Sequence, residues 1–212
     1  MLAAAVVAGA YWGYLPGWPG IGGVARSAEV AAASRTASAE LDRRLAETAG
    51  TLPGAPRRLG DATLDRCLRE RREFASDPAL PVFCQRQTAL YLAFDGNVQD
   101  VARQWCEKLN AAHWQGSAAP FPPGAGYRAE RYDYIDSATD DYLVITMISD
   151  QESLPLLKNE QYFEGATQFR REQRPLGDMS AAESALSSGH RVAEISLIRT
   201  YFSEGPRPRP PY

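Results

Sequence analysis

The three cysteines are the residues whose type and spacing most directly allow chemistry. Cys67 and Cys84 lie in polar segments seventeen residues apart, and Cys106 lies in an amphipathic segment. No CxxC motif or neighbouring histidine completes a zinc ligand set. We expect a Cys67–Cys84 disulfide, stabilising the fold by roughly 3 kcal/mol through loop closure, and a buried free thiol at Cys106. A bridge to Cys106, or three free thiols, are the alternatives.

His113 and His190 are the only histidines of the chain, which limits the possible pairs of nucleophile and base. Serines are numerous, but no GxSxG or similar nucleophile turn is present. We therefore assign no catalytic residue. A secreted hydrolase that uses His190 or His113 with an acidic or hydroxyl partner is the alternative function.

Acidic residues and glycines form two further clusters of types that can bind ligands. The acidic cluster consists of Asp133 and the three aspartates of the DSATDD segment, Asp136, Asp140 and Asp141. The segment lacks the oxygen-ligand spacing of a calcium loop, so we interpret it as a solvated turn. The glycines of GWPGIGG neither follow a strand nor open a helix, which excludes a phosphate cradle. We expect no metal and no cofactor.

Tyrosines are dense in one part of the chain and form a candidate binding patch: Tyr127, Tyr132, Tyr134 and Tyr142. Tyr132 and Tyr134 fall on the same face of a predicted strand. An exposed row of such rings could stack on a sugar or an extended peptide, whereas the competing interpretation is cross-strand packing with the hydroxyls at the rim.

Residues 1–25 are uncharged and largely apolar. Fourteen residues before Pro16 would form a helix of about 21 Å, which is short for a bilayer core of about 30 Å but typical of a signal peptide. We interpret residues 1–25 as a signal peptide or membrane anchor, with the small residues Gly23 and Ala25 suited to cleavage. The missing basic flank suggests a translation start upstream of Met1.

The side of the membrane follows from the cysteines. Taken literally, the positive-inside rule would place Arg26, Arg35 and the following domain in the cytoplasm. A further alternative is that the apolar segment is a buried helix of a cytosolic fold. A disulfide requires an oxidising compartment, so we expect a domain that is secreted or anchored to the cell membrane and extracytoplasmic.

Composition indicates an ordinary folded protein. The net charge is -3 with acidic and basic residues mixed, which excludes the electrostatic footprint of a nucleic-acid partner. Arginine almost replaces lysine and alanine is abundant, which is typical of a GC-rich bacterial genome.

Periodicity divides the rest of the chain into three parts. Residues 26–60 form a predicted helical spacer and linker, residues 61–203 a globular domain, and residues 204–212 a disordered proline-rich tail. Alternating apolar residues predict strands over 86–95, 127–136, 142–150 and 191–202. Helical spacing over 98–114 and 180–188 predicts two helices.

The order strand, helix, strand, strand, helix, strand is that of a ferredoxin-like split βαβ fold. We therefore predict an α+β domain: a four-stranded antiparallel sheet with helices on one face, preceded by an apolar helix and a helical spacer. The expected function is a non-enzymatic extracytoplasmic bacterial domain that binds a ligand or protein or serves in the envelope. A cytosolic regulatory ferredoxin-like domain is the other alternative.

Overall fold

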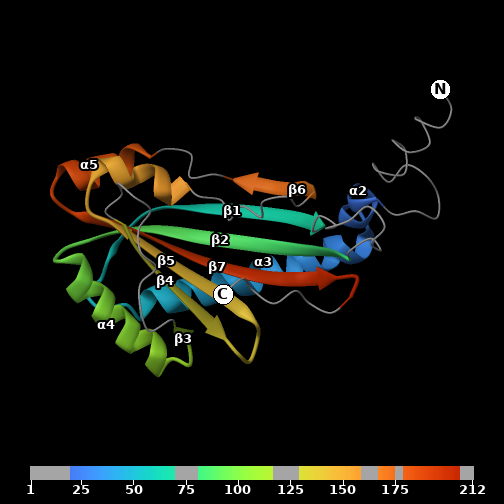
Figure 1. Cartoon of the computed structure of the whole chain (residues 1–212), viewed down its shortest axis with the longest axis horizontal. Helices are drawn as coiled ribbons and strands as arrows, with labels where there is room; N and C mark the ends of the chain where they lie inside the picture. The colour runs from blue at the N-terminus through green and yellow to red at the C-terminus, as the bar shows by residue number, and fades with distance from the viewer. Residues whose placement is uncertain (1–19, 70–80, 117–128, 159–166, 175–178, 206–212) are drawn as a thin grey trace, which may run out of the picture.

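The computed structural model describes residues 20–69, 81–116, 129–158, 167–174 and 179–205. Its seven strands form one antiparallel sheet in the order β3-β4-β5-β7-β2-β1-β6 (Figure 1). The strands are β1 (Arg57–Arg69), β2 (Val82–Phe94), β3 (Gln115–Gly116), β4 (Ala129–Asp136), β5 (Asp141–Ile148), β6 (Thr167–Arg174) and β7 (Arg191–Ser203). The helices are α2 (Ile21–Ala25), α3 (Ala28–Gly50), α4 (Val98–Ala111), η1 (Gln151–Lys158) and α5 (Ser180–Ser187).

The predicted fold class is wrong, because the sheet has seven strands and the four predicted ones are arranged differently. In the split βαβ fold the first strand would lie between the third and fourth, whereas here β7 lies between β5 and β2. Helices also cover both faces. The elements themselves were mostly predicted correctly: α4 begins after Asn97, whose side chain caps Gln99 and Asp100, and β7 starts at Arg191 as expected.

Three strands were missed. β3 has only two residues, and β1 and β6 carry charges where a strand normally has apolar residues. β1 was interpreted partly as linker, yet it pairs with β2 along its length. Its buried residues include Asp65 and Arg66, which period-two hydrophobicity cannot detect. β6, with the sequence TQFRREQR, pairs with β1 and contains a single large apolar residue, Phe169.

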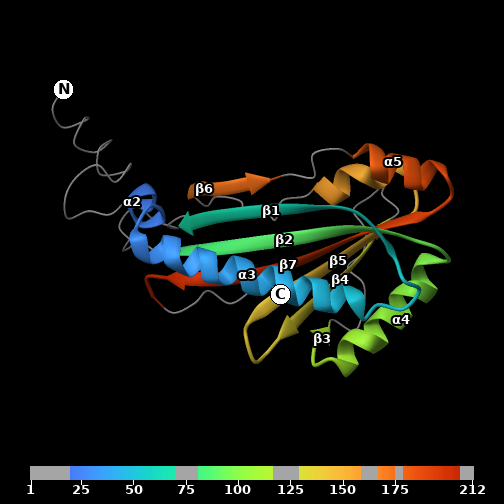
Figure 2. The same cartoon turned by 180° about the vertical axis from the view of Figure 1, so that it is seen from behind.

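Helix α3 lies along one face of the sheet, as Figure 2 shows from its own side. Leu41 and Leu45 are 0% and 2% exposed, and they join a core with α4 and the central strands. The segment 26–60, expected as a spacer and linker, therefore contributes a core helix and the start of β1 instead.

The two faces of the sheet bury different sets of side chains. On the α3 face, α3 and α4 cover Leu90, Leu92, Ile145, Ile195 and Leu197. On the opposite face, here called the α5 face, η1 and α5 cover Ala89, Tyr91, Ala93, Ile148 and Val192. The apolar α5-face cluster lies at the end of the sheet near α5, and polar residues continue along the strands beyond it.

Replacing Leu41 by alanine tests whether α3 is part of the core. Because Leu41 is completely buried, Leu41→Ala should lower the free energy of unfolding by about 2 to 5 kcal/mol. Urea denaturation measures the loss. Arg43→Ala on the exposed side of α3, where an i,i+4 pair with Glu47 is lost, should cost about 0.5 kcal/mol or less. Equal small losses would show that α3 is a spacer.

Candidate functional site

Cys67 and Cys84 face each other across β1 and β2 and form a disulfide, with 3.9 Å between their Cα atoms. Both are completely buried in a cluster with Ile21 and Val24 of α2. This is the pair favoured by the sequence. Cys106 is free on α4, and its Sγ lies 2.6 Å from the hydroxyl of Tyr134.

The tyrosines do not form one exposed row. Tyr132 and Tyr134 lie on the α3 face, and Tyr134 is 3% exposed in the core, where burial raises the pKa of its phenol. Tyr142 pairs with Ile135 on the α5 face. Its burial, and to a smaller extent the nearby charge of Asp133, raise its pKa to about 12. Cross-strand packing thus accounts for these three tyrosines, and Tyr127 lies outside the described residues.

The histidines lie apart from one another. His113 is exposed just after α4, with a φ of 72°. His190 precedes β7, and its Nδ1 lies 2.6 Å from Oδ1 of Asp95 at the end of β2. The side chain of His190 is 38% exposed and that of Asp95 is 85% exposed. In the part of the chain that the structure describes, no serine, threonine or cysteine is hydrogen-bonded to His190.

The acidic cluster is not a solvated turn throughout. Asp141 has no exposed side-chain surface, and Asp136 is 16% exposed. Asp140 at the turn remains exposed, with a φ of 56°. The prediction was wrong for Asp136 and Asp141 because their partners, arginines from α3 and β7, are distant in sequence.

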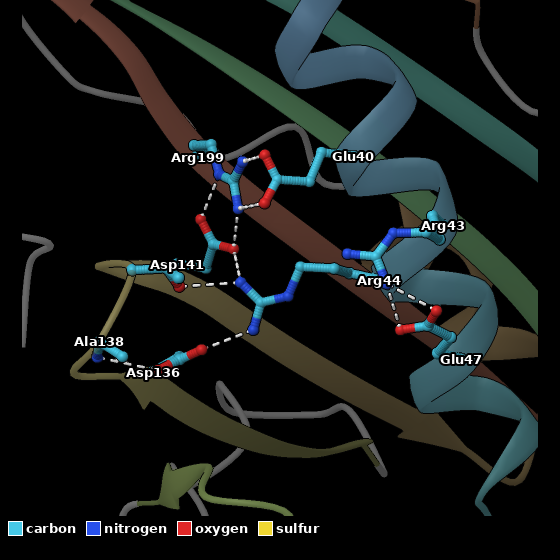
Figure 3. A network of polar contacts seen from close by, with 9 residues as sticks. Glu40, Arg43, Arg44, Glu47, Asp136, Ala138, Asp141 and Arg199 are labelled. Carbon is cyan, nitrogen blue, oxygen red and sulfur yellow. Dashed lines mark hydrogen bonds and ion pairs between the residues drawn. The ribbon is translucent and has the colours of Figure 1, made fainter.

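Figure 3 shows these partners. Arg199 of β7 donates from Nε and Nη2 to Asp141, at 2.6 Å each, and from Nη1 to Glu40 at 2.5 Å. Arg44 of α3 donates to Asp141 and, at 2.5 Å, to Asp136. We call these five residues the α3 clamp, because they connect the helix to β7 and to both ends of the β4–β5 turn.

The electrostatics of the α3 clamp keep Glu40 and Asp136 charged. The hydrogen bond from Arg199 holds the pKa of Glu40 below its usual value. Burial acts to raise the pKa of Asp136, but the Ala138 amide and Arg44 outweigh it and the pKa falls. Hydrogen bonding to Asp141 raises the pKa of Arg199. Such permanently paired charges fasten structure and are unsuited to proton transfer.

A second buried aspartate, on β1, contacts α3 near the start of that helix. Asp65 of β1 is 1% exposed and accepts hydrogen bonds from Ser34 Oγ at 2.5 Å and from Tyr201 Oη at 2.6 Å. Arg86 and Arg171 lie 3.6 and 3.5 Å from its Oδ2. Sequence reasoning missed this centre, because no local pattern relates residues on α3, β1, β2, β6 and β7.

Glu194 is the buried carboxyl group without an ion pair among the described residues. It is 7% exposed on the α5 face, between Thr146 and Tyr91 of the neighbouring strands. Ser196 Oγ donates to it at 2.5 Å, and Gln87 Nε2 donates to Ser196 at 3.0 Å. Oε1 of Gln87 is buried without a hydrogen-bond partner.

Burial raises the pKa of Glu194 to about 7, and the Ser196 hydrogen bond and the more distant charge of Arg131 offset only part of that effect. Glu194 can therefore take up or release a proton near neutral pH. Ser196, at 2% exposure, is not open to a substrate carbonyl. The arrangement is thus suited to proton binding and does not form a nucleophile site.

Within the described ranges, no helix has the length and hydropathy needed to cross a membrane. Nor does any group of three histidine, cysteine, aspartate or glutamate side chains in those ranges have the geometry to hold a metal ion. Comparison with protein families, curated proteins and solved structures finds no match to this chain.

Replacing Asp141 by asparagine tests the α3 clamp. Removing the charge leaves Arg44 and Arg199 partly buried with less compensation, so the free energy of unfolding should fall by about 3 kcal/mol or more. Urea denaturation measures it. Asp140→Asn, one residue earlier and exposed, should change the value by about 0.5 kcal/mol or less. Equal effects at both positions would contradict a buried clamp.

Glu194→Gln tests the buried proton. The pKa of Glu194 is about 7 in the fold, against an ordinary value of 4.5, so between these pH values the folded state keeps a proton that the unfolded state releases. Stability should then decline as pH rises from 4.5 to 7, by at most about 1.4 kcal/mol per unit.

The variant cannot ionise at this position and should not show this decline. Its free energy of unfolding relative to the wild type should therefore increase between pH 4.5 and 7 and level off above pH 7. Denaturation at a series of pH values measures the difference. Glu107→Gln, on the exposed side of α4, is the control and should run parallel to the wild type. A parallel curve for Glu194→Gln would show that Glu194 has an ordinary pKa.

Proposed function

We propose that this chain is a non-enzymatic, extracytoplasmic domain of a bacterial envelope, attached to the cell membrane through its N-terminal segment and serving in ligand or protein binding. The partner is a protein or small molecule, and nucleic acid is not among the candidates, since the net charge is -3 with mixed signs.

The observation that carries the proposal is the Cys67–Cys84 disulfide. The bridge joins paired positions near one end of β1 and β2 and is completely buried. Structural disulfides of this kind form and persist in oxidising compartments and are rare in the cytosol. The largely apolar, uncharged residues 1–20, which precede α2, support export or anchoring from the sequence side.

A secreted hydrolase is the second candidate, and the contact between His190 and Asp95 is the observation that favours it. An acid that orients a histidine is two-thirds of a catalytic triad. Both side chains of the pair are exposed to solvent, however, and among the described residues no nucleophile is hydrogen-bonded to His190. The binding role is therefore the better supported of the two.

Counting free thiols in protein isolated from cells tests the proposal. Denatured without reduction, the full chain should react with one equivalent of a maleimide probe, at Cys106, and with three after reduction. Mass spectrometry gives the count. A topology reporter fused after Tyr212 should report an extracytoplasmic location.

Cys106→Ser is the matched control and should show no reactive thiol before reduction. Three reactive thiols in the unreduced wild-type chain, or a cytoplasmic reporter signal, would overturn the proposal.

A further inference from the structure

Helix α2 is docked onto one end of the sheet immediately after the apolar N-terminal segment. Ile21, Val24 and Ala25 are 7%, 8% and 0% exposed, and they pack around the Cys67–Cys84 disulfide. Five residues cannot form a stable helix alone, so these contacts hold it in place.

Polar contacts fix the junction between α2 and α3. Arg171 of β6 donates to the carbonyl oxygen of Ala25, and the guanidinium of Arg26 lies over the ring of Phe169, 4.7 Å from its centre. Ser27 caps α3 by accepting from the amide of Val30 at 3.2 Å. Only Arg26 and Ser27 separate α2 from α3, and both make contacts that fix the junction.

The sequence before this docked helix contains no charged residue from Met1 to Pro19. Packing against the domain begins at Gly20 and Ile21, one or two residues later. If the apolar helix predicted before Pro16 is inserted in a bilayer, only residues 16–19 separate it from the folded domain. The position of α2 then determines which end of the domain lies at the membrane surface.

We propose that the end of the sheet carrying α2 and the disulfide stands directly against the lipid headgroups, in a fixed orientation, with the α4 and α5 end held away from them. The inference rests on the proposed membrane attachment and adds the surface that meets the lipid. A rigid joint thus takes the place of the helical spacer expected from the sequence.

The geometry gives the distance between the two ends. Helix α3, with 23 residues, starts beside α2 and runs toward α4, a length of roughly 34 Å. β2 and β7 connect the same two ends (Figures 1 and 2). His190 and Asp95, at the α5 end, would project away from the bilayer, where a partner can reach them.

Spin labels at the two ends test this orientation. In a Cys106→Ser background with the disulfide intact, nitroxides are attached at Glu29→Cys beside α2 and at Gln99→Cys on α4, both exposed positions. The full chain is placed in phosphatidylcholine nanodiscs containing a nickel-chelating lipid. Relaxation enhancement by the nickel should be several-fold greater at position 29 than at position 99.

The outcomes separate the two proposals. A chain that does not enter the nanodiscs overturns both the membrane attachment and the orientation. A chain that enters them but shows equal enhancement at both positions, or more at position 99, overturns the orientation alone. Circular dichroism of each labelled variant and its thiol count verify that the fold and the disulfide are retained.

A flexible glycine-serine insert between Pro19 and Gly20 tests the joint itself, because it leaves every described contact of α2 intact. The insert should reduce the enhancement at position 29 toward that at position 99. An unchanged enhancement would show that the orientation does not come from the docked helix, and would overturn the rigid joint.

Discussion

Helix α3 is held across the sheet by two buried aspartates, and most of the architecture depends on that attachment. Asp65 accepts a hydrogen bond from Ser34 near the start of the helix, and Asp141 accepts one from Arg44 nearer its end. Leu41 and Leu45, near Arg44, supply the apolar contact. Moving a carboxylate out of water costs several kcal/mol, so each aspartate must be surrounded by donors, and those donors come from separate elements. The helix, the β4–β5 turn and β7 are therefore positioned as one unit.

The same requirement distinguishes the polar centres of the two faces. On the α3 face, Arg199 lowers the pKa of Glu40, and the Ala138 amide with Arg44 lowers that of Asp136, so these two carboxylates stay charged. On the α5 face, Glu194 has a serine donor and no ion pair among the described residues, so burial dominates and its pKa rises. One sheet thus contains permanently charged clusters that fasten it and a carboxyl group whose charge responds to pH.

The disulfide end of the sheet combines the features that bear on function. Cys67 and Cys84 are buried beneath α2, and the polar contacts of Arg26 and Arg171 continue this packing to the edge strand β6. The covalent bridge and the docked helix restrain the same region, where the chain leaves its apolar segment. The exposed His190–Asp95 pair lies at the opposite end. This polarity agrees with a domain that is held at one end and binds at the other.

Several features were readable from local sequence alone. The spacing of apolar residues in α4, β5 and β7 reflects burial within each element, and the cysteine content favoured the bridge that is present. Strand order, β1, β6 and the packing of α3 were not readable, because they depend on charges whose partners lie far along the chain. Arg199 and Glu40 are 159 residues apart, yet they form one ion pair beside Asp141. A hydrophobic pattern records which apolar side chains are buried, whereas burial of a charge is possible only where the tertiary fold brings its counter-charge.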